Sequence, residues 1–183
     1  MKRVLTVAAL RTELLLAPRP RAALGVGKAA APRLAKLLDR KRPAGVLVVG
    51  FSGATRAGLP PRTLLIADRA GDVSLPEELV TKAKELLPEA EVGPLVQVQA
   101  PAAPEEKASF SPDALAVDME SEALAAELSS QRVPFLILRC VLDALWEDLT
   151  RGPRLRWMGR ALSCARKLGR GAWALAPLLE GGA

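Results

Sequence analysis

The chain has 183 residues, is 50% hydrophobic and 25% charged, and carries a formal net charge of +6. This composition is typical of a folded domain with a sizeable core and excludes a disordered chain. Histidine is absent, which excludes mechanisms that need imidazole, including Ser-His-Asp hydrolysis, Cys-His nucleophile systems and His-ligated zinc. We therefore expect carboxylates to carry any acid and base chemistry.

The cysteine content and the apolar segments indicate a cytoplasmic protein. Cys140 and Cys164 are too few for a disulfide framework or a four-ligand metal site, and both lie in apolar segments. We expect two buried thiols, no metal and no cofactor. The apolar segment before Arg11 is too short for a signal peptide, and no segment approaches the ~20 apolar residues that span a bilayer.

Short apolar runs in the first half of the chain predict strands that alternate with helices. We expect strands over residues 4–10, 22–26, 46–49 and 63–67. Helices are expected over residues 29–38 and 77–87. Between the third and fourth strands, residues 50–54 (GFSGA) form a Gly-rich loop whose small residues let the backbone approach a ligand or a neighbouring strand.

The second half of the chain continues the alternation. Residues 95–98 are a weak strand, and residues 99–112, with three prolines, are the most loop-like segment. Further strands are expected over 115–117 and 135–142, with an Ala/Leu/Glu-rich helix ending near residue 130 between them. This order indicates an α/β sandwich in which helices cover both faces of a central sheet, and we expect a single domain over residues 1–183.

The positive charge is concentrated in the C-terminal segment. Residues 151–183 hold seven arginines and lysines against Glu180 alone, which accounts for the whole net charge of +6. Basic and apolar residues alternate there at helical spacing, which predicts an amphipathic helix with a basic outer face. The basic set is Arg156, Arg160, Lys167 and Arg170, and the apolar set is Leu155, Met158, Leu162, Ala165 and Leu168. A solvated face is the simplest interpretation, and salt-sensitive nucleic-acid binding is the alternative.

Three carboxylates stand where strands end or helices begin. Glu13 follows the first predicted strand, Glu120 follows residues 115–117, and Asp143 follows the last strand. Each has an ordinary interpretation, such as a first-turn charge for Glu120 or a helix cap for Asp143. Ligand sites of open α/β sheets collect at strand ends, so together these residues predict a cleft in which carboxylates do the chemistry.

Four segments resemble the nucleoside phosphorylase and nucleosidase superfamily, in particular 5′-methylthioadenosine/S-adenosylhomocysteine nucleosidases and hopanoid-associated phosphorylase-like proteins. The segments are residues 8–13 (AALRTE), 25–28 (GVGK), 49–54 (VGFSGA), and 116–123 (AVDMESEA) followed by 135–143. The most specific part is Val-Asp-Met-Glu with the downstream Arg139 and Asp143. The resemblance implies a three-layer α/β/α sandwich with a central mixed sheet.

The resemblance also implies roles for the three carboxylates in cleavage of a purine nucleoside. Breaking the N-glycosidic bond builds positive charge on the ribose and sends electrons into the base, so an acid is needed at the base and a nucleophile at C1′. Asp143 matches the acid that protonates N7, which requires a pKa raised by burial. Glu13 matches the residue that activates water, and Glu120 matches the acceptor of the ribose hydroxyls.

Four further residues match substrate-contacting positions of the family. Met119 matches the residue that packs against the sugar. Gly53 matches a loop glycine near the base, with Ser52 and Ala54 beside it. We interpret Arg139, which also stands in a family position, as structural.

The departures from the family pattern lie on the substrate side. Leu142 replaces a serine, and Phe51 replaces a smaller residue in the Gly-rich loop, which implies an altered pocket. Phosphorylases of this type carry an arginine where this chain has Val48, so we favour water over phosphate, although Arg11 and Arg56 leave an anion site open.

We therefore expect a purine nucleosidase. The alternatives are a phosphate-dependent nucleoside phosphorylase and a non-catalytic relative that binds a nucleoside-like ligand or a partner protein. The resemblance further implies a homo-oligomer, and the absence of asparagine with abundant Ala, Leu, Arg and Pro suggests a GC-rich, thermophilic source.

Overall fold

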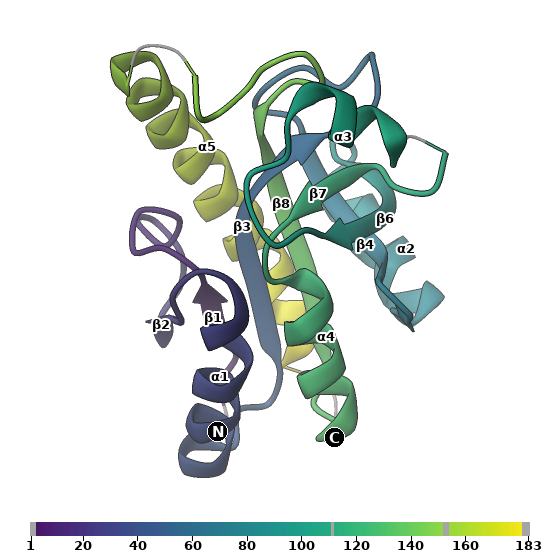
Figure 1. Cartoon of the computed structure of the whole chain (residues 1–183). Helices are drawn as coiled ribbons and strands as arrows, with labels where there is room; N and C mark the ends of the chain where they lie inside the picture. The colour runs from purple at the N-terminus through teal and green to yellow at the C-terminus, as the bar shows by residue number, and fades with distance from the viewer. Residues whose placement is uncertain (1–2, 111, 152–153, 181–183) are drawn as a thin grey trace.

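The computed structural model describes residues 3–110, 112–151 and 154–180, in which one mixed sheet is surrounded by helices (Figure 1). The strands are β1 (Leu5–Ala8), β2 (Arg21–Ala23), β3 (Val46–Ala54), β4 (Leu64–Ala70), β5 (Val73–Ser74), β6 (Glu91–Gln97), β7 (Ala116–Asp118) and β8 (Phe135–Asp143). The α-helices are α1 (Ala30–Lys41), α2 (Glu77–Leu86), α3 (Pro104–Ser109), α4 (Ser121–Ser130) and α5 (Arg154–Leu175), and the 3₁₀ helices are η1 (Gly27–Ala29) and η2 (Ala176–Leu179). The expected α/β fold with a mixed central sheet is confirmed.

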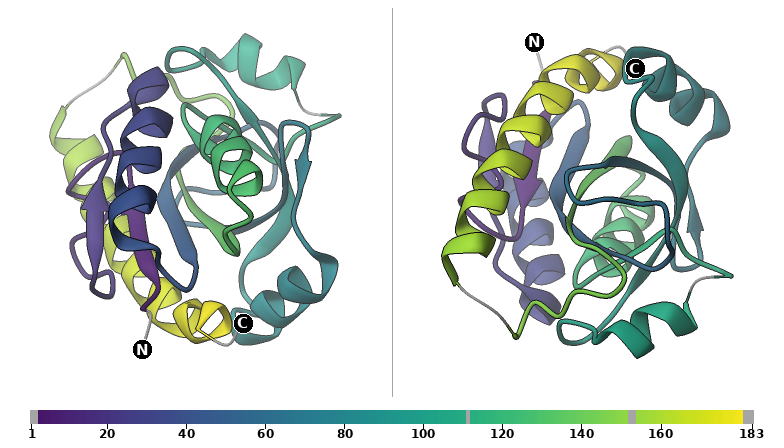
Figure 2. Two further views of the ribbon diagram at one scale, coloured as in Figure 1. Left: turned by 90° about the horizontal axis from the view of Figure 1, so that it is seen from below. Right: turned by 90° about the horizontal axis from the view of Figure 1, so that it is seen from above.

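Part of the sheet closes into a ring. β3 pairs in parallel with β1 and β8, β8 pairs antiparallel with β4, and β4, β6 and β7 follow in parallel before β7 returns antiparallel to β3. Figure 2 shows this ring end-on, with α1 and α5 on opposite sides of β1. Because β1, β3 and β8 are parallel, their carboxyl ends lie at one edge of the sheet, where α/β proteins place their ligand sites.

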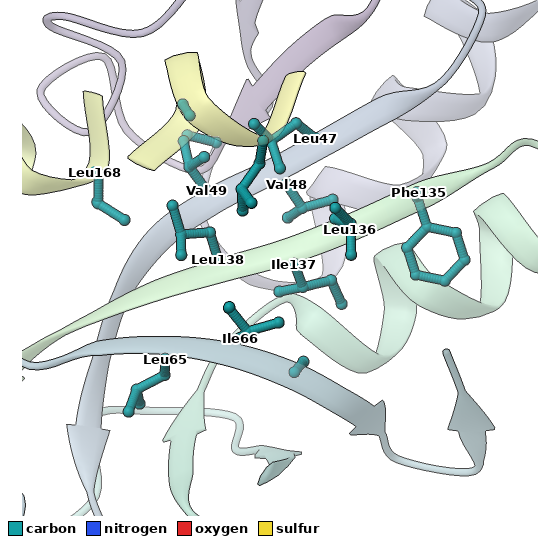
Figure 3. Close-up of a cluster of buried hydrophobic side chains, with 14 of the residues drawn as sticks. Leu47, Val48, Val49, Leu65, Ile66, Phe135, Leu136, Ile137, Leu138 and Leu168 are labelled. Atoms are coloured by element: carbon teal, nitrogen blue, oxygen red, sulfur yellow. The ribbon is translucent and has the colours of Figure 1, made fainter. Parts of the chain in front are cut away.

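The centre of the core lies on β3 and β8 (Figure 3). Val46–Val49 on β3 and Leu136–Leu138 on β8 are fully buried, and Leu168 of α5 packs with them. Both faces of these strands are covered, which explains why they are continuous apolar runs rather than alternating ones.

Two segments that the sequence predicted as loops are regular. Residues 50–54 continue β3, and Gly50 pairs with Arg139 of β8. The loop expectation was wrong here because small residues in a central strand serve close packing against long side chains, not a turn. Within the expected loop 99–112 lies α3, which starts with Pro104 at its first turn, a position that proline favours.

The C-terminal helix forms, but the predicted apolar face is wrong over its first half. Leu155, Met158 and Leu162 are 80%, 65% and 42% exposed, whereas Ala165 and Leu168 are buried as expected. Arg160 turns inward instead, because its guanidinium forms an ion pair with Glu147. The Cζ atom of Arg160 also lies 5.1 Å from the centre of the Trp157 ring. The basic outer face is confirmed further along, where Arg166, Lys167 and Arg170 are exposed.

Two smaller expectations concern the thiols and the membrane. Cys140 and Cys164 are both buried and unpaired, as predicted. Over the described ranges, no helix combines the length and the apolar character that crossing a membrane requires.

Candidate active site

A cavity of about 170 Å³ lies at the carboxyl ends of β1, β3 and β8. The helix α3 lies at the same end of the molecule as the end of β8 (Figure 1). Six of the seven residues predicted to contact substrate line it: Glu13, Ser52, Gly53, Met119, Glu120 and Asp143. Ala54 is buried in β3 and is not among the lining residues. Most of the remaining lining side chains are apolar, so charged groups in the cavity lose much of their hydration.

Glu13 is held by backbone N–H groups just after β1 and within β3. Its Oε2 accepts the N–H of Leu10 (2.7 Å) and its Oε1 accepts the N–H of Phe51 (2.8 Å). Burial raises the pKa of Glu13 to about 7, against the opposing effects of these N–H groups and of the Arg139 guanidinium, and the negative charge of Glu120 raises it slightly further. A carboxylate with a pKa near neutrality can take up a proton at physiological pH.

Glu120 precedes α4 and is fixed by an inner layer of polar residues. Its Oε1 accepts the N–H of Gly27 (2.8 Å), and burial raises its pKa. Behind it, Asp118 Oδ2 lies 2.7 Å from Nε of the buried Arg139, and Ser121 accepts from the same guanidinium. Arg139 therefore neutralises a buried acid and supports Glu120, in keeping with the structural role expected for it.

Asp143 reaches the cavity through an irregularity in β8. Ser52 pairs with Val141 whereas Gly53 pairs with Asp143, so Leu142 is an extra residue in the ladder. Such a bulge redirects the side chain that follows it. Asp143 is 2% exposed, and burial raises its pKa although the Lys107 ammonium opposes the rise.

Sequence reasoning missed Lys107, the cation of this cavity. Its side chain is fully buried, and Nζ lies 2.6 Å from Asp143 Oδ2, 2.7 Å from the carbonyl oxygen of Ala144 and 2.6 Å from that of Glu147. All three ammonium protons therefore have acceptors. A single lysine in a proline-rich segment offers no pattern that separates it from a solvated lysine, so only the fold could reveal it.

Asp143 and Lys107 pack closely against β3 at Gly53, and a larger residue there would crowd them. A Cβ on Gly53 would lie 3.0 Å from Asp143 Oδ2 and 3.2 Å from Lys107 Cδ. We expect Gly53→Ala to lower the free energy of unfolding by about 1–3 kcal/mol through overpacking. The measurement is chemical denaturation, with Gly159→Ala as the control, because a Cβ on Gly159 of α5 would meet nothing within 4 Å.

In the control, alanine should raise the free energy of unfolding by about 0.5–1 kcal/mol, as expected for glycine in a helix interior. A Gly53→Ala protein as stable as the wild type would contradict the close packing of Asp143 and Lys107 on β3.

Comparison with solved structures identifies the fold. A futalosine hydrolase mutant of Helicobacter pylori matches with a TM-score of 0.82 at 17% identity, over 97% of this chain and 99% of that chain. The chain has a nucleosidase fold. The 5′-methylthioadenosine/S-adenosylhomocysteine nucleosidase of Streptococcus pneumoniae, solved with a transition-state inhibitor, matches this fold with a TM-score of 0.77 at 19% identity, over 97% and 98% of the two chains.

A third nucleosidase-fold match is the S-adenosylhomocysteine nucleosidase of Streptococcus pyogenes in complex with 5-methylthiotubericidin, with a TM-score of 0.79, 18% identity, and 98% and 96% of the two chains covered. No protein-family model and no curated protein matches the sequence. The resemblance to nucleosidases drawn from the sequence segments is thus confirmed at the level of the nucleosidase fold.

Proposed function

We propose that this chain hydrolyses the N-glycosidic bond of a purine nucleoside, with water as the nucleophile. The observation that carries the proposal is the meeting of Glu13, Glu120 and Asp143 in one mostly apolar cavity, although they lie far apart in the chain. The nucleosidase fold and the nucleoside-like ligands named for two of the matching structures support a small-molecule nucleoside as the substrate.

In the proposed reaction the C1′–N9 bond breaks and its electron pair passes to the purine. Asp143 donates its proton to N7, so the base leaves neutral. The oxygen of a water molecule bonds to C1′, and the proton that this water loses passes to Glu13. Glu120 accepts hydrogen bonds from the ribose hydroxyls and so holds the sugar between the acid and the base.

The environments of the carboxylates fit these roles. An acid at N7 must be protonated before the reaction, and burial raises the pKa of Asp143 toward that state. The base must be ionised at working pH and still accept a proton, which fits the pKa of about 7 for Glu13. Met119 lines the cavity next to Glu120, where it can pack against the sugar.

Base release from a nucleoside panel tests the proposal. The panel contains 5′-methylthioadenosine, S-adenosylhomocysteine, futalosine, adenosine and inosine, each with and without phosphate. We expect release of the free base without phosphate from at least one of them. If the folded protein releases no base from any nucleoside of the panel, the proposed hydrolysis is contradicted. Base release that requires phosphate would contradict water as the nucleophile.

Phosphorolysis is the second candidate, and the structure offers it little support. Val48 is fully buried in β3, and Arg11 and Arg56 are exposed and are not among the residues that line the cavity. Neither arginine is therefore placed to bind an anion inside the cavity. The phosphate arm of the panel distinguishes the two reactions.

The non-catalytic alternative predicts that side chains fill the space beside Gly53. Asp143 and Lys107 do pack there, yet Gly53 still lines the cavity. We therefore favour an active enzyme. Assembly into a homo-oligomer, a cytoplasmic location and a thermophilic source stay predictions.

A further inference from the structure

Lys107 is a buried charged residue of the cavity that the proposed mechanism leaves without a role. It projects from α3 and is 0% exposed, and its three ammonium protons go to Asp143, Ala144 and Glu147. These acceptors lie at the end of β8 and just after it, so one side chain ties α3 to the segment that carries Asp143. A buried lysine needs acceptors for its three N–H donors, and all three donors have them here.

The two oxygens of Asp143 differ sharply. Oδ2 lies 2.6 Å from Lys107 Nζ, whereas Oδ1 is buried and has no hydrogen-bond partner within the described part of the chain. An unpartnered buried carboxylate oxygen is costly unless something else binds it. Asp143 lines the cavity, so a ligand there is the natural partner for Oδ1.

We propose that Lys107 is a positioning residue for the acid: it occupies Oδ2 of Asp143 and so confines the transferable proton to Oδ1, the oxygen left for the leaving base. This inference rests on the proposed function for its chemistry. The proton on Oδ1 passes to N7 as the C1′–N9 bond breaks, and Lys107 keeps its own three protons throughout. The carboxylate that remains is stabilised by the ammonium on Oδ2.

The ammonium also changes the acidity of Asp143. Burial raises the pKa of Asp143, and Lys107 opposes that rise through its hydrogen bond and its charge. Glu147, in the segment after β8, raises the pKa slightly, and Arg160 of α5 lowers it slightly. Lys107 is thus the main opposing group, and without it Asp143 would be a weaker acid that stays protonated to higher pH.

The test is a titration of the Asp143 carboxyl by ¹³C NMR in the wild type, Lys107→Met and Lys107→Arg, with the signal assigned by its loss in Asp143→Asn. Methionine removes the charge and keeps most of the stem, whereas arginine keeps the charge. We expect the midpoint of Asp143 to rise by about one to three pH units in Lys107→Met, the range for loss of an adjacent opposite charge. Lys107→Arg should leave it nearer the wild-type value.

Lys82→Met is the matched control, because Lys82 forms an exposed ion pair with Glu78 on α2, and it should leave the Asp143 midpoint unchanged. If the wild type releases base, its activity should fall at high pH as Asp143 loses its proton. In Lys107→Met this fall should occur at a higher pH. A folded Lys107→Met protein with an unchanged Asp143 midpoint would overturn the proposal.

A second measurement needs no variant at position 107. The ¹⁵Nζ signal of Lys107 in the wild type should shift with the same midpoint as the Asp143 carboxyl, because Nζ lies 2.6 Å from Asp143 Oδ2, and a Lys107 signal that does not respond to the titration of Asp143 would overturn the proposal. Both titrations are read without substrate. Failure of the nucleoside panel therefore contradicts the proposed function, whereas an unchanged Asp143 midpoint contradicts the role of Lys107.

Discussion

Asp143→Asn is expected to lower kcat for base release by about 10²–10⁴-fold, the usual contribution of a general acid. Asparagine keeps the size of the side chain but has no carboxylic proton to give to N7, so the base must leave as an anion. KM should change less than kcat, because the proton transfer occurs in the transition state and not in the bound ground state. Steady-state kinetics with the best substrate of the panel is the measurement.

Two controls separate chemistry from folding in this experiment. Asp143→Asn replaces the carboxyl group to which the buried Lys107 donates, so thermal unfolding must show that the variant is folded at the assay temperature. Asp72→Asn changes an exposed carboxylate in the turn after β4 and should keep wild-type kcat. A folded Asp143→Asn enzyme with wild-type kcat would remove Asp143 from the mechanism.

Glu13→Gln is expected to lower kcat by a similar factor, about 10²–10⁴-fold, because glutamine cannot take the proton from water. Glutamine also has only one oxygen for the two N–H groups of Leu10 and Phe51 that Glu13 now accepts. Glu89→Gln, which changes an exposed side chain between α2 and β6, is the matched control and should keep full activity.

The pH profile gives Glu13 a signature of its own. Burial raises its pKa to about 7, and only the ionised form can act as a base. The wild-type kcat/KM should therefore rise with pH and reach half of its maximum near pH 7. The residual activity of Glu13→Gln should not show this rise. A wild-type profile that is flat between pH 5 and 8, a range that spans this pKa of about 7, would contradict Glu13 as the base.

The same pKa shift predicts an effect on stability that needs no substrate. The pKa of Glu13 rises from 4.5 to about 7 on folding, so the folded protein binds this proton more tightly than the unfolded chain does. The resulting stabilisation is complete below pH 4.5 and is lost as the pH rises through 7. Relative to Glu13→Gln, the wild type should lose about 3 kcal/mol of unfolding free energy over that range, and equal slopes against pH would contradict the shift.

The elements and their order could be predicted from the sequence because they depend on local patterns. Continuous apolar runs mark strands that are buried on both faces, as on β3 and β8. Such patterns do not show where a strand stops when small residues follow it, so the sequence predicts a loop at residues 50–54, which continue β3. Nor do they show which side of a long helix faces the protein when a distant Glu147 binds its arginine.

The sequence by itself determined the alternation of strands and helices, the strand-end positions of Glu13, Glu120 and Asp143, and the exclusion of imidazole chemistry. Only the tertiary structure decided how these carboxylates are held in the cavity and that Lys107 lies beside them. The bulge at Leu142 sets the direction of Asp143, and the burial of Lys107 against it depends on the packing of α3 at the end of β8. A pKa depends on desolvation and on charges that are distant in the chain, so it is a property of the fold and not of the residue type.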